Sequence, residues 1–133
     1  MLVQIAVAVL AGFFGALLKD FVVRPLREYR QVRKKIAKDL IKYSHLITSP
    51  GGGTPGKMDE ARYELRDDAA ELRAVMEYLP GYVLWSLFWV PSPSTLERVE
   101  GRLIRLSNSS HSGDPIRNHE DRRWVRELLR IGR

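Results

Sequence analysis

Residues 1–18, MLVQIAVAVLAGFFGALL, contain no charged side chain, and residues 19–42, KDFVVRPLREYRQVRKKIAKDLIK, carry nine Lys or Arg against three acids. A helix of about 18 to 22 residues reaches about 27 to 33 Å, which matches the roughly 30 Å hydrocarbon core of a bilayer. A cleaved signal peptide would carry basic residues before its apolar part, and none precedes this run. We therefore expect residues 1–23 to form a transmembrane anchor that is retained.

The positive charge of the chain is concentrated directly after this apolar run. The formal net charge is +6, and residues 19–42 account for all of it, which favours an anionic membrane surface over nucleic acid as the partner. Lys and Arg close to a span favour the cytoplasmic side, which predicts an N-terminus outside and a cytoplasmic domain over residues 24–133. Seven cations are expected to bind anionic headgroups: Arg24, Arg27, Arg30, Arg33, Lys34, Lys35 and Lys38.

Small side chains recur at four-residue spacing inside the expected span. Such residues let a second helix approach closely, and a polar side chain on the same side adds an interhelical hydrogen bond. The candidate helix-packing residues are Gln4, Ala8, Ala11, Gly12, Gly15 and Ala16. They favour a homo-oligomer, although glycine and alanine are also common in transmembrane helices in general.

Helical periodicity continues through the rest of the chain. From Pro25 to Ile47 apolar residues recur every three or four positions, which is typical of an amphipathic helix. Pro25 either lies in the first turn of this helix or marks a kink in a helix that continues from the span. Residues 48–56 are rich in Gly and Pro and indicate a flexible linker. A second helix, acidic and with coiled-coil-like spacing, is predicted over residues 58–79, and the opposite charges favour an antiparallel hairpin.

Two shorter helices are predicted after a strongly apolar stretch at residues 82–90. That stretch is too short to cross a bilayer and belongs either to the core or to a membrane-interfacial segment. Ser94 starts a capping box and a helix that extends to Leu106, and Asn118 is a candidate cap for a last helix through Ile131. The sequence thus predicts an all-α protein, with one N-terminal transmembrane helix followed by a small cytoplasmic helical bundle.

No arrangement of residues predicts catalysis or a metal site. The chain has no cysteine, and its three histidines have no second ligand at metal-binding spacing. Gly51 to Lys57 matches the start of a phosphate-binding P-loop, but Met58 stands where that motif needs a hydroxyl, and no strand pattern precedes it. The acidic run at residues 59–71 is interleaved with Arg, which favours salt bridges along its own helix. We therefore expect no enzyme, no cofactor and no small-molecule substrate.

Five segments follow one another in the chain after the apolar run: RKKIA at 33–37, ELR at 64–66, AELRA at 70–74, LIRLSNS at 103–109 and the segment at 124–131. They resemble segments of uncharacterised bacterial single-span membrane proteins with a cytoplasmic helical domain. The resemblance implies a single-pass protein of the bacterial cytoplasmic (inner) membrane, and it supplies no activity and no functional residue. Its Leu-Ser-Asn-Ser element is either a capped helix end or a contact surface.

The leading functional hypothesis is a membrane-anchored helical interaction or scaffold module whose cationic juxtamembrane helix faces lipid. Its expected partners are a bilayer with anionic headgroups, an unidentified protein and a second copy of the chain. One alternative is an oligomeric membrane-perturbing effector that inserts the Trp-rich stretch at residues 82–90. The other is a nucleic-acid-binding membrane tether that uses the charges of residues 24–42.

Overall fold

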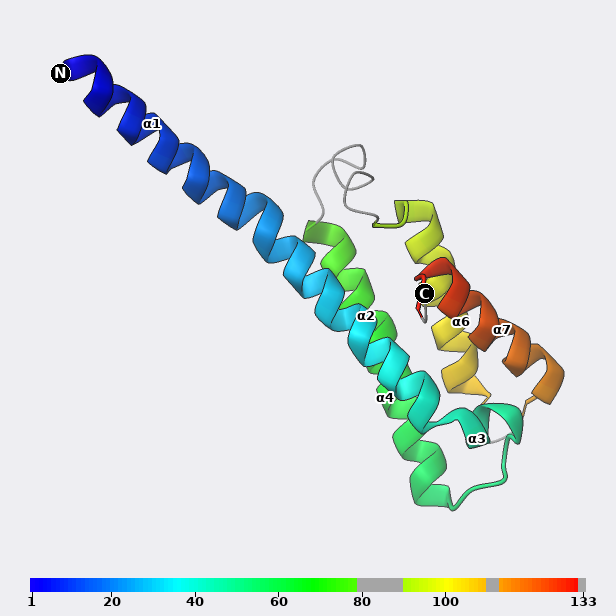
Figure 1. Ribbon diagram of the computed structural model, residues 1–133. Helices are drawn as coiled ribbons and strands as arrows, with labels where there is room; N and C mark the ends of the chain where they lie inside the picture. The colour runs from blue at the N-terminus through cyan, green and yellow to red at the C-terminus, as the bar shows by residue number, and fades with distance from the viewer. Residues whose placement is uncertain (79–89, 110–112, 132–133) are drawn as a thin grey trace.

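The computed structural model describes residues 1–78, 90–109 and 113–131, and within these ranges the protein is helical with no strand (Figure 1). The α-helices are α1 (Leu2–Leu18), α2 (Arg24–Lys42), α3 (Ser44–Thr48), α4 (Pro55–Tyr78), α6 (Pro93–Asn108) and α7 (Pro115–Leu128), and a π-helix, η1, covers Lys19–Val23. The all-α prediction is confirmed. The apolar stretch at residues 82–90 lies outside the described residues except for Val90, which is buried.

The first three elements, α1, η1 and α2, form one continuous helical rod whose N-terminal part extends away from the bundle (Figure 1). Pro25 accounts for the π-helical turn, because proline has no N–H and its ring clashes with the preceding turn of an α-helix. The helix widens there, and the Arg24 N–H donates to the Lys19 carbonyl five residues earlier. Pro25 is therefore a first-turn residue of α2 and also the junction at which the helix continues from α1.

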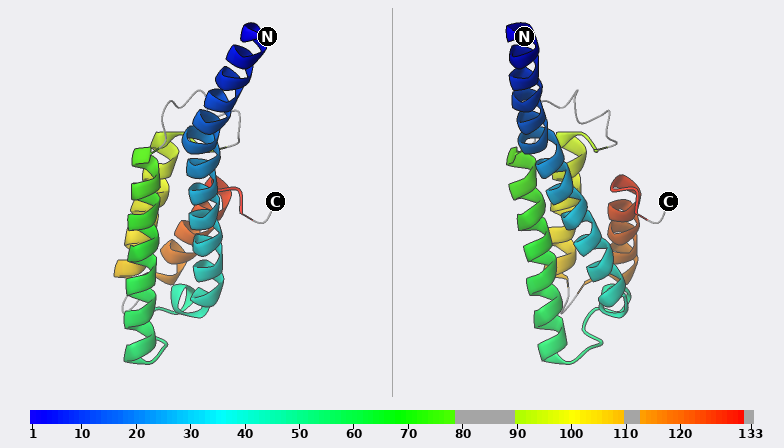
Figure 2. Two further views of the ribbon diagram at one scale, coloured as in Figure 1. Left: turned by 90° about the vertical axis from the view of Figure 1, so that its left-hand side faces the viewer. Right: turned by 60° about the vertical axis from the view of Figure 1, so that its left-hand side comes forward.

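The predicted hairpin is formed by α2 and α4, which pack side by side in opposite directions (Figure 2). Their opposite charges pair as expected, with Lys35 bonded to Asp68 and Lys42 bonded to Glu60. The first helix ends earlier than predicted, since the backbone leaves helical geometry at Tyr43 and turns into α3. The buried Tyr43 side chain donates to Glu60 Oε1 at 3.0 Å, so the break places this ring inside the hairpin.

Three helices begin with a capping side chain followed by proline: Thr54-Pro55, Ser92-Pro93 and Asp114-Pro115. In each case the cap oxygen accepts a backbone N–H of the first turn, at 3.3, 3.2 and 3.0 Å respectively. Proline suits the position after a cap, because an N–H there would have no partner within the helix. The predicted caps Ser94 and Asn118 are therefore wrong, since both lie inside helices that begin earlier.

The hydrophobic core lies between the helices of the bundle. Besides the hairpin of α2 and α4, α6 packs against α4 and α7, and α3 packs against α7 (Figures 1 and 2). The apolar seams predicted for the hairpin are buried as expected, except that Met58 and Met76 are only partly buried and Leu79 lies outside the described residues. Fully buried side chains come from all of these helices, including Ile36, Leu40, Leu46, Leu65, Leu72, Leu96, Leu103 and Val125. The bundle therefore has a continuous apolar interior to which α1 contributes no buried residue.

The predicted anchor at residues 1–23 corresponds to α1 and η1. Among the helices of residues 1–78, 90–109 and 113–131, none combines the length and the apolar character needed to cross a membrane.

Candidate functional site

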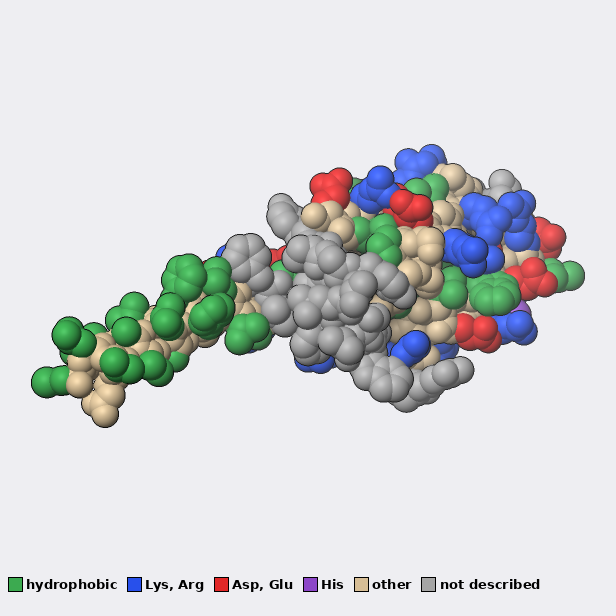
Figure 3. All heavy atoms as spheres, turned by 90° about the horizontal axis from the view of Figure 1, so that it is seen from above, with side chains coloured by type: hydrophobic (Ala, Val, Ile, Leu, Met, Phe, Trp, Pro, Cys, Tyr) green, Lys and Arg blue, Asp and Glu red, His purple; other side chains and the backbone are tan. Residues whose placement is uncertain are grey.

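The most conspicuous surface of the protein is α1, an uncharged helix with no buried residue that projects from the bundle (Figure 3). The predicted packing residues from Gln4 to Ala16 recur on one side of it, because positions four apart return to a similar angle around a helix. A methyl group at Gly12 or Gly15 would meet no atom within 4 Å, so both glycines face open space. This side of α1 is therefore accessible to lipid or to another helix.

A second surface is the cationic stripe, defined as the exposed Lys and Arg side chains of α2 on the side away from the bundle. Five of the seven cations predicted to face lipid belong to it: Arg24, Arg27, Arg30, Lys34 and Lys38. Their spacing of three or four residues aligns them along the helix. Arg24 also lies 3.9 Å from Glu28, an exposed pair that contributes little and leaves the stripe positively charged.

The other two predicted lipid-facing cations, Arg33 and Lys35, are half-buried and are used inside the fold. Arg33 Nε donates to the Leu129 carbonyl at 2.7 Å, and its guanidinium also donates to the Arg130 carbonyl. These carbonyls lie at the C-terminal end of α7, where the last turn of a helix lacks intrahelical donors. Arg33 therefore joins α2 to α7. The neighbouring Tyr29 is buried, and burial raises the pKa of its hydroxyl to about 12.

Lys35 lies on the opposite flank of α2 and joins it to α4. Its ammonium is surrounded by four carboxylates, at 2.7 Å from Asp68, 2.8 Å from Asp67, 3.5 Å from Glu64 and 3.8 Å from Asp39. Partial burial favours the neutral amine, but the hydrogen bonds to Asp67 and Asp68 outweigh it and raise the pKa of Lys35. Lys35 is thus a charged link within the hairpin.

Two members of this cluster, Asp39 and Asp68, are buried, and each has one carboxylate oxygen without a hydrogen-bond donor among the described residues. Burial raises the pKa of the Asp68 carboxyl, and the adjacent Asp39 carboxyl raises it further. The Asp68 carboxyl therefore holds its proton more tightly than an exposed aspartate does. No group of three metal-binding side chains occurs in the part of the chain that the structure describes, so the cluster is not assigned to a cation.

The Leu-Ser-Asn-Ser element at residues 106–109 combines the two roles left open by the sequence. The Ser109 Oγ lies 3.0 Å from the Leu106 carbonyl oxygen at the end of α6 and 2.9 Å from Asn118 Oδ1 of α7, and its single hydroxyl proton is available to either acceptor. Arg66 of α4 donates to the side chains of Ser107 and Asn108 at 3.2 and 2.8 Å. The element is therefore a capped helix end at which α4, α6 and α7 are joined.

Further ion pairs connect helices rather than running along one helix. Asp121 of α7 is buried and accepts from Arg102 at 2.8 Å and from Arg105 at 2.5 Å, both on α6. Arg73 of α4 lies 3.5 Å from Glu100 of α6. The prediction that Arg and acidic residues of the second helix pair along its own surface is therefore wrong for Arg66 and Arg73, because α6 lies within reach of both.

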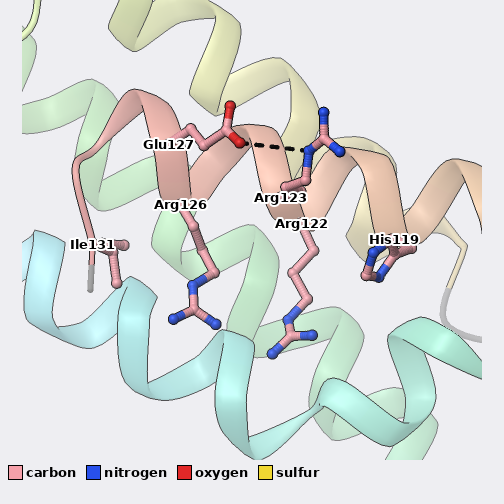
Figure 4. A pocket seen from close by; sticks show the side chains of 6 residues that line it. All are labelled: His119, Arg122, Arg123, Arg126, Glu127 and Ile131. Atoms are coloured by element: carbon pink, nitrogen blue, oxygen red, sulfur yellow. Dashed lines mark ion pairs between the residues drawn. The ribbon is translucent and has the colours of Figure 1, made fainter. Parts of the chain in front are cut away.

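Two cations that the sequence did not single out, Arg122 and Arg126, extend from α7 toward α2 (Figure 4). They line a hollow of about 300 Å³ together with His119, Arg123, Glu127 and Ile131. Their four-residue spacing is a helical signal, but a sequence containing many arginines does not reveal which of them lack acidic partners. Gly51 to Lys57, the segment that matches only the start of a P-loop, spans the loop and the first turn of α4, and Lys57 lies 3.9 Å from Glu60.

Comparison with known proteins adds no further assignment. No protein-family model, no curated protein and no solved structure matches the chain.

Proposed function

We propose that this protein is a non-enzymatic, membrane-anchored helical interaction module, with α1 inserted in the bacterial cytoplasmic membrane and the bundle in the cytoplasm. The observation that carries the proposal is α1 itself, which has 17 residues, no charge and no buried side chain. Exposed apolar surfaces larger than a few hundred Å² usually mark a contact with a partner or a membrane. Since α1 contributes nothing to the core, its apolar side chains require a contact outside the bundle. Lipid can contact all faces of this helix at once.

α1 alone is shorter than an undistorted bilayer requires, so the proposal relies on local thinning of the bilayer and on the continuation of the helix through η1. Its 17 residues extend about 25 Å, somewhat less than the roughly 30 Å hydrocarbon core. Local thinning of the bilayer accommodates a short segment at modest cost. The helix also continues through η1, where Lys19 can direct its ammonium toward the headgroups while residues 21–23 remain apolar.

The cationic stripe would then contact lipid through its first two turns. Because α2 continues the rod of α1, it leads away from the membrane surface when α1 is inserted (Figure 2). Arg30 lies about 10 Å beyond the end of η1 along the helix axis, whereas Lys38 lies about 22 Å beyond it. The screening length at physiological salt is about 8 Å, so Arg24, Arg27 and Arg30 are the cations placed to act on anionic headgroups. The positive flank also favours the cytoplasmic side for the bundle.

The insertion step is tested by placing a charge in the middle of α1. Leu10 is 55% exposed, so Leu10→Arg leaves the bundle intact. Exchanging Leu for Arg at the centre of a span costs about 3 to 4 kcal/mol, which shifts the protein at least about a hundredfold toward the non-inserted form. The matched control is Tyr63→Arg, which adds the same charge at a 70% exposed position on α4.

The assay is membrane fractionation with alkaline carbonate extraction, combined with a reporter fused after Arg133. The natural sequence and Tyr63→Arg should stay in the membrane pellet with a cytoplasmic reporter, and Leu10→Arg should be extracted. Extraction of the natural sequence would contradict insertion, and a reporter signal outside the cytoplasm would contradict the proposed orientation.

Association with a second copy is the part of the proposal that α1 supports through Gly12 and Gly15, whose open faces allow close helix approach. Replacing both by Leu should reduce crosslinked oligomers in membranes without changing fractionation. If crosslinking is unchanged in this variant, the two glycines do not hold copies of the chain together, and they reflect only the high frequency of glycine in transmembrane helices. The partner would then be an unidentified protein.

A further inference from the structure

The surface of α7 that faces α2 contains a hollow that membrane anchoring does not use. It has a volume of about 300 Å³ and is lined by His119, Arg122, Arg123, Arg126, Glu127 and Ile131. Figure 4 shows that Arg122 and Arg126 extend to one side of α7, toward α2, whereas Arg123 and Glu127 extend to the other side. The hollow therefore presents two guanidinium groups, one turn apart, toward the same space.

These two cations have no acidic partner among the described residues. Arg123 lies 3.5 Å from Glu127, and the nearby Asp121 accepts from Arg102 and Arg105 of α6. Arg122 and Arg126 are half-buried, and the Nε of Arg122 is buried without a hydrogen-bond acceptor. Burial lowers the pKa of Arg122, and the charge of Arg126 lowers it further.

Such an arrangement is unfavourable for the protein alone. Like charges four residues apart on a helix repel, and a buried donor without an acceptor loses its hydration without compensation. The facing helix adds a further cation on this side of α7, since Arg33 of α2 donates to the carbonyls of Leu129 and Arg130. A dianion in the hollow would neutralise both guanidinium groups and supply the missing acceptor.

We propose that this hollow binds the phosphate group of a small phosphate monoester, with Arg122 and Arg126 as its two guanidinium ligands. Arginine matches a phosphate by donating two parallel N–H groups, and charge-assisted hydrogen bonds of this kind are about twice as strong as neutral ones. The volume exceeds that of a bare phosphate and lies at the lower end for small-ligand pockets. Ile131 at one end offers an apolar wall for a short organic group.

The position of the hollow favours a soluble ester over a lipid headgroup. The C-terminal end of α7 meets α2 at Arg33, nine residues beyond Arg24, and α7 leads from there toward α3 at the end of the bundle far from α1 (Figure 1). Arg33 already lies about 15 Å along α2 from the end of η1, and Arg122 lies farther away. An upright bundle therefore keeps the hollow outside the headgroup layer.

The test measures ligand binding to the full chain in non-ionic detergent by calorimetry. The probes are inorganic phosphate and glycerol phosphate, with sodium chloride at matched ionic strength as the reference. Arg126→Gln and Arg122→Gln should each weaken binding of both phosphates by about tenfold or more, since each removes a charged hydrogen-bonding group. Arg117→Gln is the control, because it removes the same charge from an exposed position of α7 that does not line the hollow and should leave the affinity unchanged.

A second measurement separates binding from folding. Without phosphate, Arg126→Gln should be at least as stable to urea as the natural sequence, because it removes a repelling neighbour of Arg122. Phosphate should raise the stability of the natural sequence and of Arg117→Gln but not of Arg126→Gln. Equal binding by the Arg117 and Arg126 variants would overturn the site, as would a marked loss of unliganded stability in Arg126→Gln. Binding of phosphatidic acid in nanodiscs without binding of glycerol phosphate would overturn the assignment to a soluble ester.

Discussion

Replacing Lys35 by Met removes a cation that lies within 3.8 Å of four carboxylates from α2 and α4: Asp39, Glu64, Asp67 and Asp68. Met keeps most of the length and the apolar stem of Lys, so the loss of packing is small. The substitution therefore isolates the electrostatic part of the hairpin contact.

The magnitude follows from the two shortest contacts, at 2.7 Å to Asp68 and 2.8 Å to Asp67. A hydrogen bond to a charged group contributes about 1.5 to 3 kcal/mol. The Lys35 and Asp67 side chains are 31% and 39% exposed, so water replaces part of this interaction when the cation is removed. We expect a loss of about 2 to 4 kcal/mol, which corresponds to a fall of about 8 to 16 °C in Tm for a bundle of this size.

The assay is urea unfolding of the full chain in non-ionic detergent, followed by circular dichroism. Lys34→Met is the matched control, because Lys34 is the adjacent residue and is exposed, and it should change the unfolding free energy by less than about 0.5 kcal/mol. Adding Asp68→Asn to Lys35→Met should recover part of the loss, since it removes the buried acid that the missing cation leaves behind.

The loss caused by Lys35→Met should also be larger at pH 8 than at pH 5, because carboxyl groups without a cation can take up protons at the lower pH. A loss below about 1 kcal/mol at pH 8 would refute the assignment of Lys35 as the link of the hairpin. A loss equal to that of Lys34→Met, or no recovery in the double variant, would refute it as well.

Three further predictions test a cap, a titration and the orientation of α2. Ser92→Ala should cost about 1 kcal/mol of unfolding free energy and Ser94→Ala less than about 0.5 kcal/mol, because Ser92 accepts the Thr95 N–H. The pKa of Asp68 is raised from 3.8 to about 8, so the folded state binds this proton more tightly than the unfolded chain does. The contribution of Asp68 to the unfolding free energy should therefore fall between pH 4 and pH 8. This fall should be absent in Asp68→Asn. Because the chain has no cysteine, a fluorescent probe can be attached at a single position through Arg27→Cys or Lys38→Cys. Spin-labelled lipid headgroups should quench the fluorescence at position 27 far more than at position 38. Equal quenching at the two positions would mean that α2 lies along the membrane.

Local periodicity is the feature of this chain that the sequence determines by itself. The recurrence of apolar residues every three or four positions predicts the helices, since a helix returns to the same face at that spacing. Ile36, Leu40, Leu65 and Leu72 are buried as this pattern predicts. The opposite net charges of the two long helices likewise favour their pairing in a hairpin, because the net charge of each helix follows from its composition alone.

Helix boundaries depend on short-range geometry that periodicity does not report. Both Ser92 and Ser94 are suitable caps by residue type, and the proline after Ser92 decides between them because its φ angle is already helical. Asp114 before Pro115 is the same signal and was available in the sequence. The break at Tyr43 had no such signal, since it arises from placing the ring and its hydroxyl against α4.

Only the tertiary structure decides which charges remain available to partners. Lys34 and Lys35 are adjacent in a basic segment, yet one is exposed and the other joins two helices, because successive residues of a helix point about 100° apart. Arg102 and Arg105 meet Asp121 across an interface, whereas Arg122 and Arg126 do not meet an acid among the described residues. Pairing of this kind requires side chains distant in sequence to come within about 4 Å, and only the packing of the helices sets those distances.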